Sequence, residues 1–578
     1  MIKSIQLFTA LLLAALMATA QGNKPANIFT EEDWNKLSQQ QRDSINKKFS
    51  AEFEAARKAA ANADEERAKE QFANALANVA GTKTLTVTSY PKTALPDGLS
   101  KLTQLEEFAC VGCKTLDLNL LFQQLGTLPK LKKLNLTDGG YRSIPNSIKE
   151  VKQLEQLVLK DNNMAALPDS LVALSNLKQL NLEHCAYLYD DDVFSKLKGT
   201  KVQALNFSSS GLLSLSDKIG EATSLTNLDL SHNDIRTLPA GVSKLQNLQQ
   251  LNLNQNLSLD LTQVTGVLVA LPKLEELYLE QCELTSLPLD IVKLTSLQKL
   301  SLKANRLTAL PINFGSLSKL RYLDLGYFEM GVRMNKINDL GPTFGSLKEL
   351  TYLNIAGNGL AALPIGFDGL VNLEELNISL NKLTELPAAV CKLSKLTILN
   401  AGLNDIGSVP AEIAGLKQLR ELNLQGNFFN KADKKIKALP DDICRLGNLQ
   451  VLILKDNVIE KLPDCVGNLQ ALQKLDLRDN LIQQLPESFT KLAKLQWLDL
   501  KANDLTELPT DFGRLTSLRE LNCSMNLKLG YEQVKLMFSS MKQLEFLDLS
   551  YNNITSTQIQ PLRDALPNCK VVNWDYKR

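Results

Sequence analysis

The residues best suited to chemistry in this sequence are its two histidines and its nine cysteines. His184 directly precedes Cys185, an arrangement that could pair a general base with a thiol nucleophile. Cys110 and Cys113 are separated by two residues, a spacing found in redox pairs and in one half of a zinc site. No second cysteine pair follows at metal-binding spacing. Whether either motif is catalytic or binds a metal therefore depends on the secondary-structure elements that hold these residues.

A nine-residue phrase, L-x-x-L-x-L-x-x-N, recurs from residue 82 almost to the end of the chain. Most successive phrases start 23 residues apart, and two steps are 30 residues long. With substitutions, the ninth position falls about twenty times, at Tyr90, Cys113, Gly139, Asn162, Cys185, Ser210, Asn233, Asn256, Cys282, Asn305, Phe328, Asn358, Asn381, Asn404, Asn427, Asn457, Asn480, Asn503, Asn526 and Asn552.

The phrase has a direct physical interpretation. Side chains of an extended x-L-x-L-x segment alternate between two faces, so the leucines point inward and the intervening residues outward. The ninth residue turns the chain, and its amide can bond the backbone of the neighbouring turn, where polar groups would otherwise be buried unpaired. Cys185 and Cys113 occupy this ninth position, and Cys110 an inward strand position. We therefore predict structural cysteines, no catalytic residue, no metal site and no cofactor.

These motifs make the sequence resemble the leucine-rich repeat family, over residues 82–576. Its L-P-x-x-I/F/V half-unit, as in Leu386-Pro387 through Val390, is similar to that of the Ras-suppressor-like and plant intracellular repeat proteins. The resemblance implies an α/β solenoid: a curved horseshoe with a parallel β-sheet on its concave face. It assigns residues 82–578 to one repeat domain of about 20 repeats plus a closing strand.

The N-terminal residues differ from the repeats. Residues 1–20 combine a basic start at Lys3, a short apolar run and small residues at Ala18 and Ala20, which predicts a cleaved signal peptide and export. The final compartment, whether secreted, periplasmic or at the cell surface, stays open. Residues 21–81 have helical apolar spacing that includes Trp34, Phe53 and Phe72. They predict a helical cap over the open end of the array, with a partner-binding arm as the alternative.

Exported proteins commonly form disulfides, but the cysteine-rich caps of many extracellular repeat proteins are missing here. Buried free thiols are therefore the favoured interpretation. Only Cys444 and Cys465, on successive units, could approach each other, and a bond between them is not expected.

The outward strand positions define the candidate partner-binding residues. One outward column is mostly Asn or Asp, and aromatic residues interrupt it and its neighbours in the middle of the array. Tyrosine is a frequent anchor in protein interfaces. The predicted site comprises Tyr278, Tyr322, Asp324, Tyr327, Tyr352 and Asn354, beside a seven-residue insertion at 328–334 expected to form an edge loop. A second, more charged patch comprises Lys455, Arg478, Trp497 and Lys501.

The sequence therefore predicts a non-enzymatic, exported scaffold that binds a protein or peptide on its concave face. A carbohydrate- or cell-envelope-binding module is the alternative, because Tyr and Trp can stack on sugar rings. A net charge of +1 without long runs of one sign argues against nucleic acid as a partner. No segment after the first twenty residues is apolar enough to predict a transmembrane helix.

Overall fold

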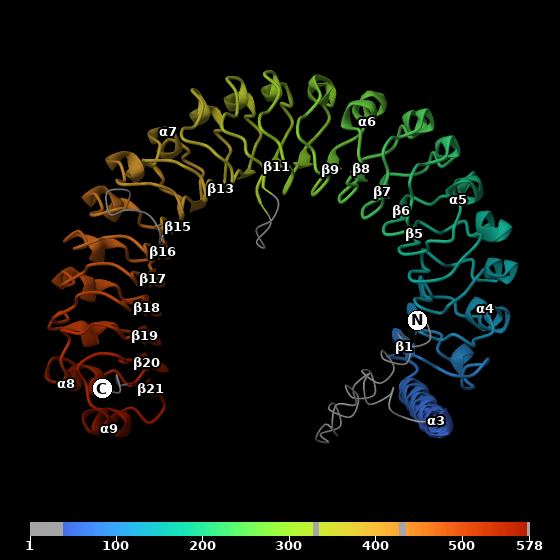
Figure 1. The fold of residues 1–578 in the computed structure, drawn as a ribbon, viewed down its shortest axis with the longest axis horizontal. Helices are drawn as coiled ribbons and strands as arrows, with labels where there is room; N and C mark the ends of the chain where they lie inside the picture. Colours follow the sequence, from blue (N-terminus) through green and yellow to red (C-terminus); the bar gives the residue numbers. More distant parts are fainter. Residues whose placement is uncertain (1–38, 328–333, 427–434, 575–578) are drawn as a thin grey trace.

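The protein is described here by a computed structural model that covers residues 39–327, 334–426 and 435–574. The predicted architecture is confirmed: the chain is an α/β solenoid curved into a horseshoe (Figure 1). A parallel sheet lines the concave face, and short helices and turns cover the convex face. The predicted signal peptide, Trp34 and most of the 328–334 insertion lie outside the described residues.

The sheet has 21 strands within the described residues. They are β1 (Thr84–Thr88), β2 (Glu107–Val111), β3 (Lys133–Asn135), β4 (Gln156–Val158), β5 (Gln179–Asn181), β6 (Ala204–Asn206), β7 (Asn227–Asp229), β8 (Gln250–Asn252), β9 (Glu276–Tyr278), β10 (Lys299–Ser301), β11 (Tyr322–Asp324), β12 (Tyr352–Asn354), β13 (Glu375–Asn377), β14 (Ile398–Asn400), β15 (Glu421–Asn423), β16 (Val451–Ile453), β17 (Lys474–Asp476), β18 (Trp497–Asp499), β19 (Glu520–Asn522), β20 (Phe546–Asp548) and β21 (Lys570–Val572). Each pairs in parallel with the next along the chain.

The α-helices are α3 (Gln39–Ala77), α4 (Leu118–Gly126), α5 (Asp190–Leu197), α6 (Leu261–Leu268), α7 (Ala388–Cys391), α8 (Tyr531–Ser540) and α9 (Ser556–Ala565). The remaining repeats return through short 3₁₀ segments, at 99–101, 146–150, 169–173, 217–221, 240–244, 289–293, 314–316, 344–346, 367–369, 411–415, 441–445, 466–468, 487–491 and 512–514. Proline precedes many of these segments, as Pro440 does before η12 (Asp441–Arg445), because it suits the start of a turn and cannot continue a strand.

Strand alternation determines where the core lies. In β13, Leu376 is buried while Glu375 on one side of it is exposed, and the same pattern recurs along the array. The buried leucines form one continuous core with phenylalanines from the return segments. Phe314, Phe344 and Phe367 stack in succession, with ring centroids 6.2–6.3 Å apart. Each repeat thus buries its apolar face against its neighbours, which is how a solenoid obtains its stability.

The ladder at the ninth position is confirmed. Asn381 donates from Nδ2 to the carbonyl oxygens of Ile355 and Ile378, each at 3.0 Å, and its Oδ1 accepts from Leu360 N. Cys185 fills the same position, with its Sγ 3.3 Å from Leu159 O. The ladder therefore satisfies backbone groups that have no access to water.

One ladder assignment was wrong. In the repeat of β11 the ladder residue is Asn335, which is 2% exposed and donates to the carbonyls of Leu302 and Leu325, and not Phe328. The extra residues lie inside the phrase, between the strand and its ladder residue, so counting nine positions reached the insertion instead. Phe328 itself, and Asn427 in the second 30-residue step, lie outside the described residues.

Helix α3 covers the first strand of the array, as expected of a cap. Ala68, Phe72 and Ala75 are buried against the core, whereas Phe53, which the predicted apolar face included, is 58% exposed. The packed face is thus confined to the C-terminal part of the helix, because only that part reaches the sheet. Long as it is, α3 is too polar to cross a membrane, and no other helix of the described residues qualifies.

Two disulfides correct the prediction of free thiols. Cys110 is bonded to Cys113, and Cys444 to Cys465. Gly112, at φ 71°, turns the chain after β2 and leaves the Cα atoms of the first pair 5.8 Å apart. Cys444 lies in η12 and Cys465 directly precedes η13 (Val466–Asn468), so stacking of successive return segments brings the second pair together. Five other cysteines are free, and four of them are buried, as predicted.

Candidate functional site on the concave face

Register in the middle of the sheet brings distant residues side by side. Tyr322 on β11 pairs with Tyr352 on β12, and two positions along each strand Asp324 pairs with Asn354. On the preceding strand, β10, Lys299 lies in register with Tyr322. All of these side chains occupy outward positions, so the fold places them together on the concave surface.

The two tyrosines form a stack. Their ring centroids are 4.3 Å apart and the ring planes differ by 4°. Lys299 Nζ lies over the rings of Tyr322 and Tyr278, at 4.7 and 5.1 Å from the centroids. Sequence reasoning missed Lys299, although its position one repeat before Tyr322 was available as a signal. A cation over an aromatic face is attracted by the ring quadrupole, so Lys299 stabilises the observed orientation of the Tyr322 and Tyr278 rings.

Asp324 lies beside this stack as a nearly buried carboxylate, 5% exposed. Its Oδ1 accepts from Gly326 N at 2.8 Å and from Asn354 Nδ2 at 3.0 Å. Burial raises the pKa of Asp324 above its ordinary value, and the two hydrogen bonds oppose that rise. Burial also raises the pKa values of Tyr322 and Tyr352, and the charge of Asp324 adds to both shifts. The Asp324 carboxylate and the hydroxyl groups of Tyr322 and Tyr352 therefore interact electrostatically.

The other predicted tyrosines occupy different positions. The Tyr278 hydroxyl donates a hydrogen bond to Glu276 Oε2 at 2.7 Å. Tyr278 is linked to the Tyr322–Tyr352 stack by Lys299, which lies over its ring as well. Tyr327 packs against the next repeat, where a Cβ on Gly357 would lie 2.7 Å from its Cδ1. We name the assembled group, Tyr278, Lys299, Tyr322, Asp324, Tyr352 and Asn354, the tyrosine site. Tyr327 is not part of it.

The second predicted patch lies on β16–β18 and the turns that follow them. Arg478 donates from Nη2 to Asp476 Oδ2 at 3.0 Å, and the Asp476 side chain is only 4% exposed. Lys474, which the sequence reasoning did not include, lies with Nζ 4.7 Å from the ring centroid of Trp497. Lys455 and Lys501 are half-buried in the column of Arg478. We name Lys455, Lys474, Arg478, Trp497 and Lys501 the charged patch.

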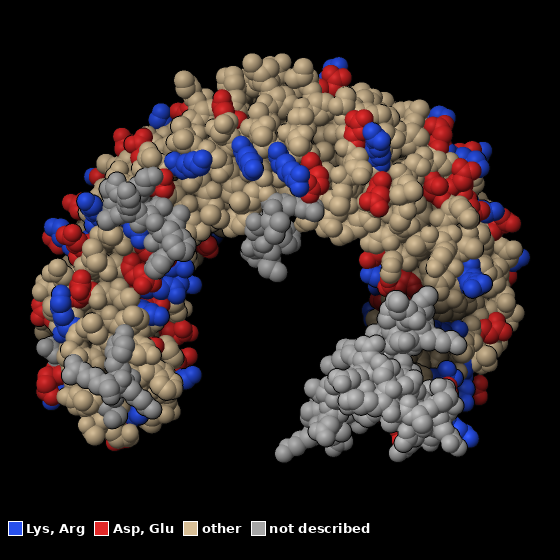
Figure 2. All heavy atoms as spheres, viewed as in Figure 1, with Lys and Arg blue, Asp and Glu red and all other residues tan. Residues whose placement is uncertain are grey.

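Acidic residues flank the charged patch. Burial raises the pKa of Asp499, and it also raises that of Asp479, where the charge of Asp456 adds to the rise. The basic side chains thus lie among carboxylates of their own surface. Acidic and basic side chains are also intermingled over the flank displayed in Figure 2.

The candidate nucleophile is not arranged for catalysis. Cys185 is fully buried, and burial raises the pKa of its thiol to about 11. His184 is exposed, and its Nδ1 lies 2.7 Å from Asp161 Oδ1. Its φ of 58° marks the turn before the ladder residue, a role that His232 repeats at 55°. The described residues also hold no group of three or more His, Cys, Asp or Glu side chains that could bind a metal ion.

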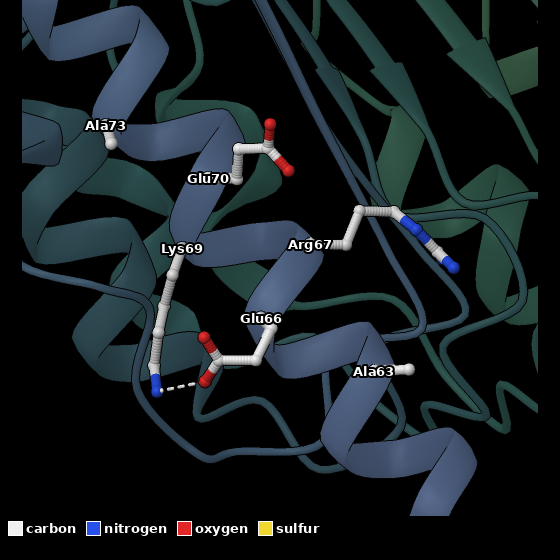
Figure 3. A pocket seen from close by; sticks show the side chains of 6 residues that line it. All are labelled: Ala63, Glu66, Arg67, Lys69, Glu70 and Ala73. Carbon is white, nitrogen blue, oxygen red and sulfur yellow. Dashed lines mark hydrogen bonds and ion pairs between the residues drawn. The ribbon is translucent and has the colours of Figure 1, made fainter.

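A surface hollow along α3 does not provide a site either. Its lining residues, Ala63, Glu66, Arg67, Lys69, Glu70 and Ala73, all come from this one helix (Figure 3). Lys69 Nζ pairs with Glu66 Oε1 at 2.9 Å, as surface residues three apart on a helix commonly do. No second element of the described residues contributes a side chain to this hollow.

Comparison with known proteins identifies the repeats. Leucine-rich repeat profiles match residues 129–186, 224–245, 272–327 and 372–429, and a leucine-rich repeat region matches 431–572. Adenylate cyclase of Schizosaccharomyces pombe is 34% identical over 94 residues, which are 16% of this chain and only 5% of that protein.

Solved structures resemble the chain over most of its length. A leucine-rich repeat protein of Leptospira interrogans is 26% identical, with a TM-score of 0.45, and the match covers 86% of this chain and 98% of that one. The plant peptide hormone receptor RGFR1, in complex with RGF2, is 21% identical with a TM-score of 0.48, covering 86% and 91% of the two chains.

Proposed function

Since the chain belongs to the leucine-rich repeat proteins, we propose that it is a non-enzymatic scaffold that binds a protein or peptide through the tyrosine site on its concave face. The observation that carries this proposal is the Tyr322–Tyr352 stack, held by Lys299 on a rigid sheet. Aromatic groups whose rotamers are already fixed lose little entropy on binding, and buried aromatic anchors dominate interface energies.

The same geometry favours a protein or peptide over a sugar. Sugar rings stack on a free aromatic face, but Tyr322 has Tyr352 over one face and Lys299 over the other. The stack presents ring edges and hydroxyl groups, which suit the mixed apolar and hydrogen-bonding contacts of a polypeptide. One face of Tyr352 has no aromatic or cationic group over it among the described residues, so a glycan is the alternative ligand to test.

We also propose that the protein is exported. Disulfides form and persist in oxidising compartments, and the Cys110–Cys113 and Cys444–Cys465 bonds accord with such a location. The proposed signal peptide is residues 1–20, followed by an N-terminal cap at 21–81 and the repeat domain at 82–578. Mass spectrometry of the mature protein is expected to find its N-terminus after Ala20, and a chain that starts at Met1 would refute the proposal.

The test of the binding function is affinity capture from an envelope and extracellular extract of the native organism, run beside a glycan array. We expect the wild-type protein to retain a protein ligand that the Tyr322→Ala/Tyr352→Ala variant loses. A Lys455→Ala/Arg478→Ala variant, on the same sheet, is the matched control and is expected to retain it. Binding to glycans alone would replace this proposal with the carbohydrate alternative.

A further inference from the structure

The tyrosine stack is asymmetric along the sheet. Lys299 on β10 covers the side of Tyr322 that faces away from Tyr352. On the opposite side, β13 follows β12, and Glu375 lies in register with Tyr352. Within the described part of the chain, no lysine or arginine lies over the Tyr352 ring. One end of the stack is therefore closed by a cation, and the other end faces a carboxylate.

One carboxylate, Glu375, lies at the open end of the stack, and a second, Asp324, lies on the far side of β12. Glu375 is exposed, and its charge, like that of Asp324, raises the pKa of the Tyr352 hydroxyl. Asp324 lies nearly buried beside the stack, and the described residues include no ion pair between it and a lysine or arginine. A buried carboxylate is costly unless it is compensated: Asn354 and Gly326 supply hydrogen bonds, and Lys303 supplies a positive charge that is not in an ion pair with it. Burial still outweighs these contributions, because the pKa of Asp324 remains raised.

We propose that the face of Tyr352 toward β13, together with Glu375, accepts an arginine side chain of the protein ligand, with the charge of Asp324 on β11 as a more distant attraction. A guanidinium group is planar, stacks on aromatic faces and donates paired hydrogen bonds to a carboxylate. Stacked on Tyr352, it would complete the series begun by Lys299, with a cation at each end of the two rings. Glu375 would accept its hydrogen bonds, and Asp324, two strands away on β11, would add a weaker long-range attraction.

This inference rests on the proposed function, so its test starts by establishing that function. A phage-displayed random peptide library is selected against the full chain, and the enriched peptides are resynthesised for binding measurements. We expect the enriched peptides to share an arginine. Replacing this arginine with glutamine is expected to weaken binding to the wild-type protein about tenfold or more.

Protein variants locate the arginine. In Asp324→Asn/Glu375→Gln the same arginine-to-glutamine replacement is expected to change affinity by less than about twofold, because the charge that it meets is gone. Glu421→Gln is the matched control: Glu421 is exposed in the same outward column, two strands beyond Glu375, and has no aromatic neighbour in register on either side. It should preserve the full effect of the arginine.

The outcomes separate the two proposals. If no peptide is enriched on the wild-type protein, the proposed protein-binding function fails. If peptides are enriched and depend on Tyr322 and Tyr352, but lack arginine or carry lysine in its place, the function stands and the arginine assignment is overturned. An arginine effect that persists in Asp324→Asn/Glu375→Gln, or is lost in Glu421→Gln, also overturns it. Circular dichroism melting of each variant verifies that the fold is intact.

Discussion

Two regions of one concave surface use charge in opposite ways. In the tyrosine site, Lys299 lies over the stacked rings, while the nearly buried Asp324 has no ion pair with a lysine or arginine among the described residues and feels the charge of Lys303 without pairing with it. In the charged patch, Arg478 is bonded to Asp476, and Lys474 lies over Trp497. Both regions lie on the same sheet, but Lys455, Arg478 and Lys501 of the charged patch lie in the turns that follow their strands, whereas the tyrosine site is built on the strands themselves. They differ in how completely their polar groups are satisfied from within.

This difference indicates where a ligand gains most. In the Arg478–Asp476 pair the two charges already stabilise each other. A ligand that engaged one of them would have to replace that contact. In the tyrosine site the rings are stacked, no lysine or arginine of the described residues lies over Tyr352, and Glu375 is exposed beside it. We therefore expect the tyrosine site, and not the more charged patch, to be the better binding surface.

The largest expected effect is on ligand binding at the tyrosine site. Tyr322→Ala/Tyr352→Ala should weaken binding by about 2 kcal/mol or more, since it removes the stacked anchor. Lys455→Ala/Arg478→Ala should cost less than about 1 kcal/mol, because its charges are internally compensated or at the rim. Titration calorimetry with the captured ligand or a selected peptide measures both. The opposite ranking would mean that the charged patch is the binding site.

The next effect concerns stability of the charged patch. Arg478→Gln removes the cation from Asp476, whose side chain is 4% exposed, and leaves a buried carboxylate without its ion-pair partner. We expect the free energy of unfolding to fall by about 1–2 kcal/mol at neutral pH, at the low end for buried pairs because the Arg478 side chain is 37% exposed. Urea denaturation measures the change.

Lys501→Gln is the control for Arg478→Gln. It neutralises a half-buried cation of the same column in the next repeat, two residues after β18 ends. Its expected cost is within about 0.5 kcal/mol. Equal losses for the two variants would show that Asp476 does not depend on Arg478.

The comparison also shows what the sequence could and could not predict. The repeat phrase was sufficient for the solenoid and for ladder residues such as Asn381, because strand alternation and backbone satisfaction follow directly from local spacing. It also placed Tyr322 and Tyr352 on the surface. It failed at Asn335, because the insertion lies within the phrase and displaces the ladder residue without changing its contacts.

The missed contacts all depend on geometry between repeats. Whether Lys299 lies over a ring or extends into solvent depends on the rotamers of two tyrosines on other strands. The Cys444–Cys465 bond needs the Cα atoms of successive return segments to approach within 5.9 Å, which a repeat period alone does not determine. Tyr327 was predicted with the other outward aromatic residues, and its packing on Gly357 of the next repeat could not be read from the sequence.

A smaller effect is expected for the buried carboxylate of the tyrosine site. Because burial raises the pKa of Asp324 in the folded state, its ionised form reduces stability above the pKa of the unfolded chain. This cost disappears as the pH falls through the raised folded value. Asp324→Asn removes the charge, and its Oδ1 can still accept from Gly326 N. The variant should be as stable as wild type or up to about 1 kcal/mol more stable at pH 7.

The pH dependence distinguishes this explanation from a change in packing. Melting temperatures of wild type and Asp324→Asn should converge as the pH is lowered from neutral toward 4, since the wild-type carboxyl becomes protonated. Asp499→Asn provides a second case beside the charged patch, because burial raises the pKa of Asp499 too. A stability difference that stays constant over this range would assign the effect to the substituted side chain's shape or hydrogen bonding.

The smallest expected effect is a kinetic one, in the charged patch. Lys455 is half-exposed near the rim of the patch, so its charge can attract an acidic ligand before contact is made. Such long-range attraction changes the association rate constant and is screened by salt, whereas the dissociation rate constant reports the contacts of the complex. For a ligand with net negative charge, Lys455→Gln should lower the association rate about twofold at low ionic strength and have no effect at about 0.5 M salt. Surface plasmon resonance across a salt series measures both rate constants. Faster dissociation at every salt concentration would instead place Lys455 in the contact surface, and the charged patch would then share the binding that we assign to the tyrosine site.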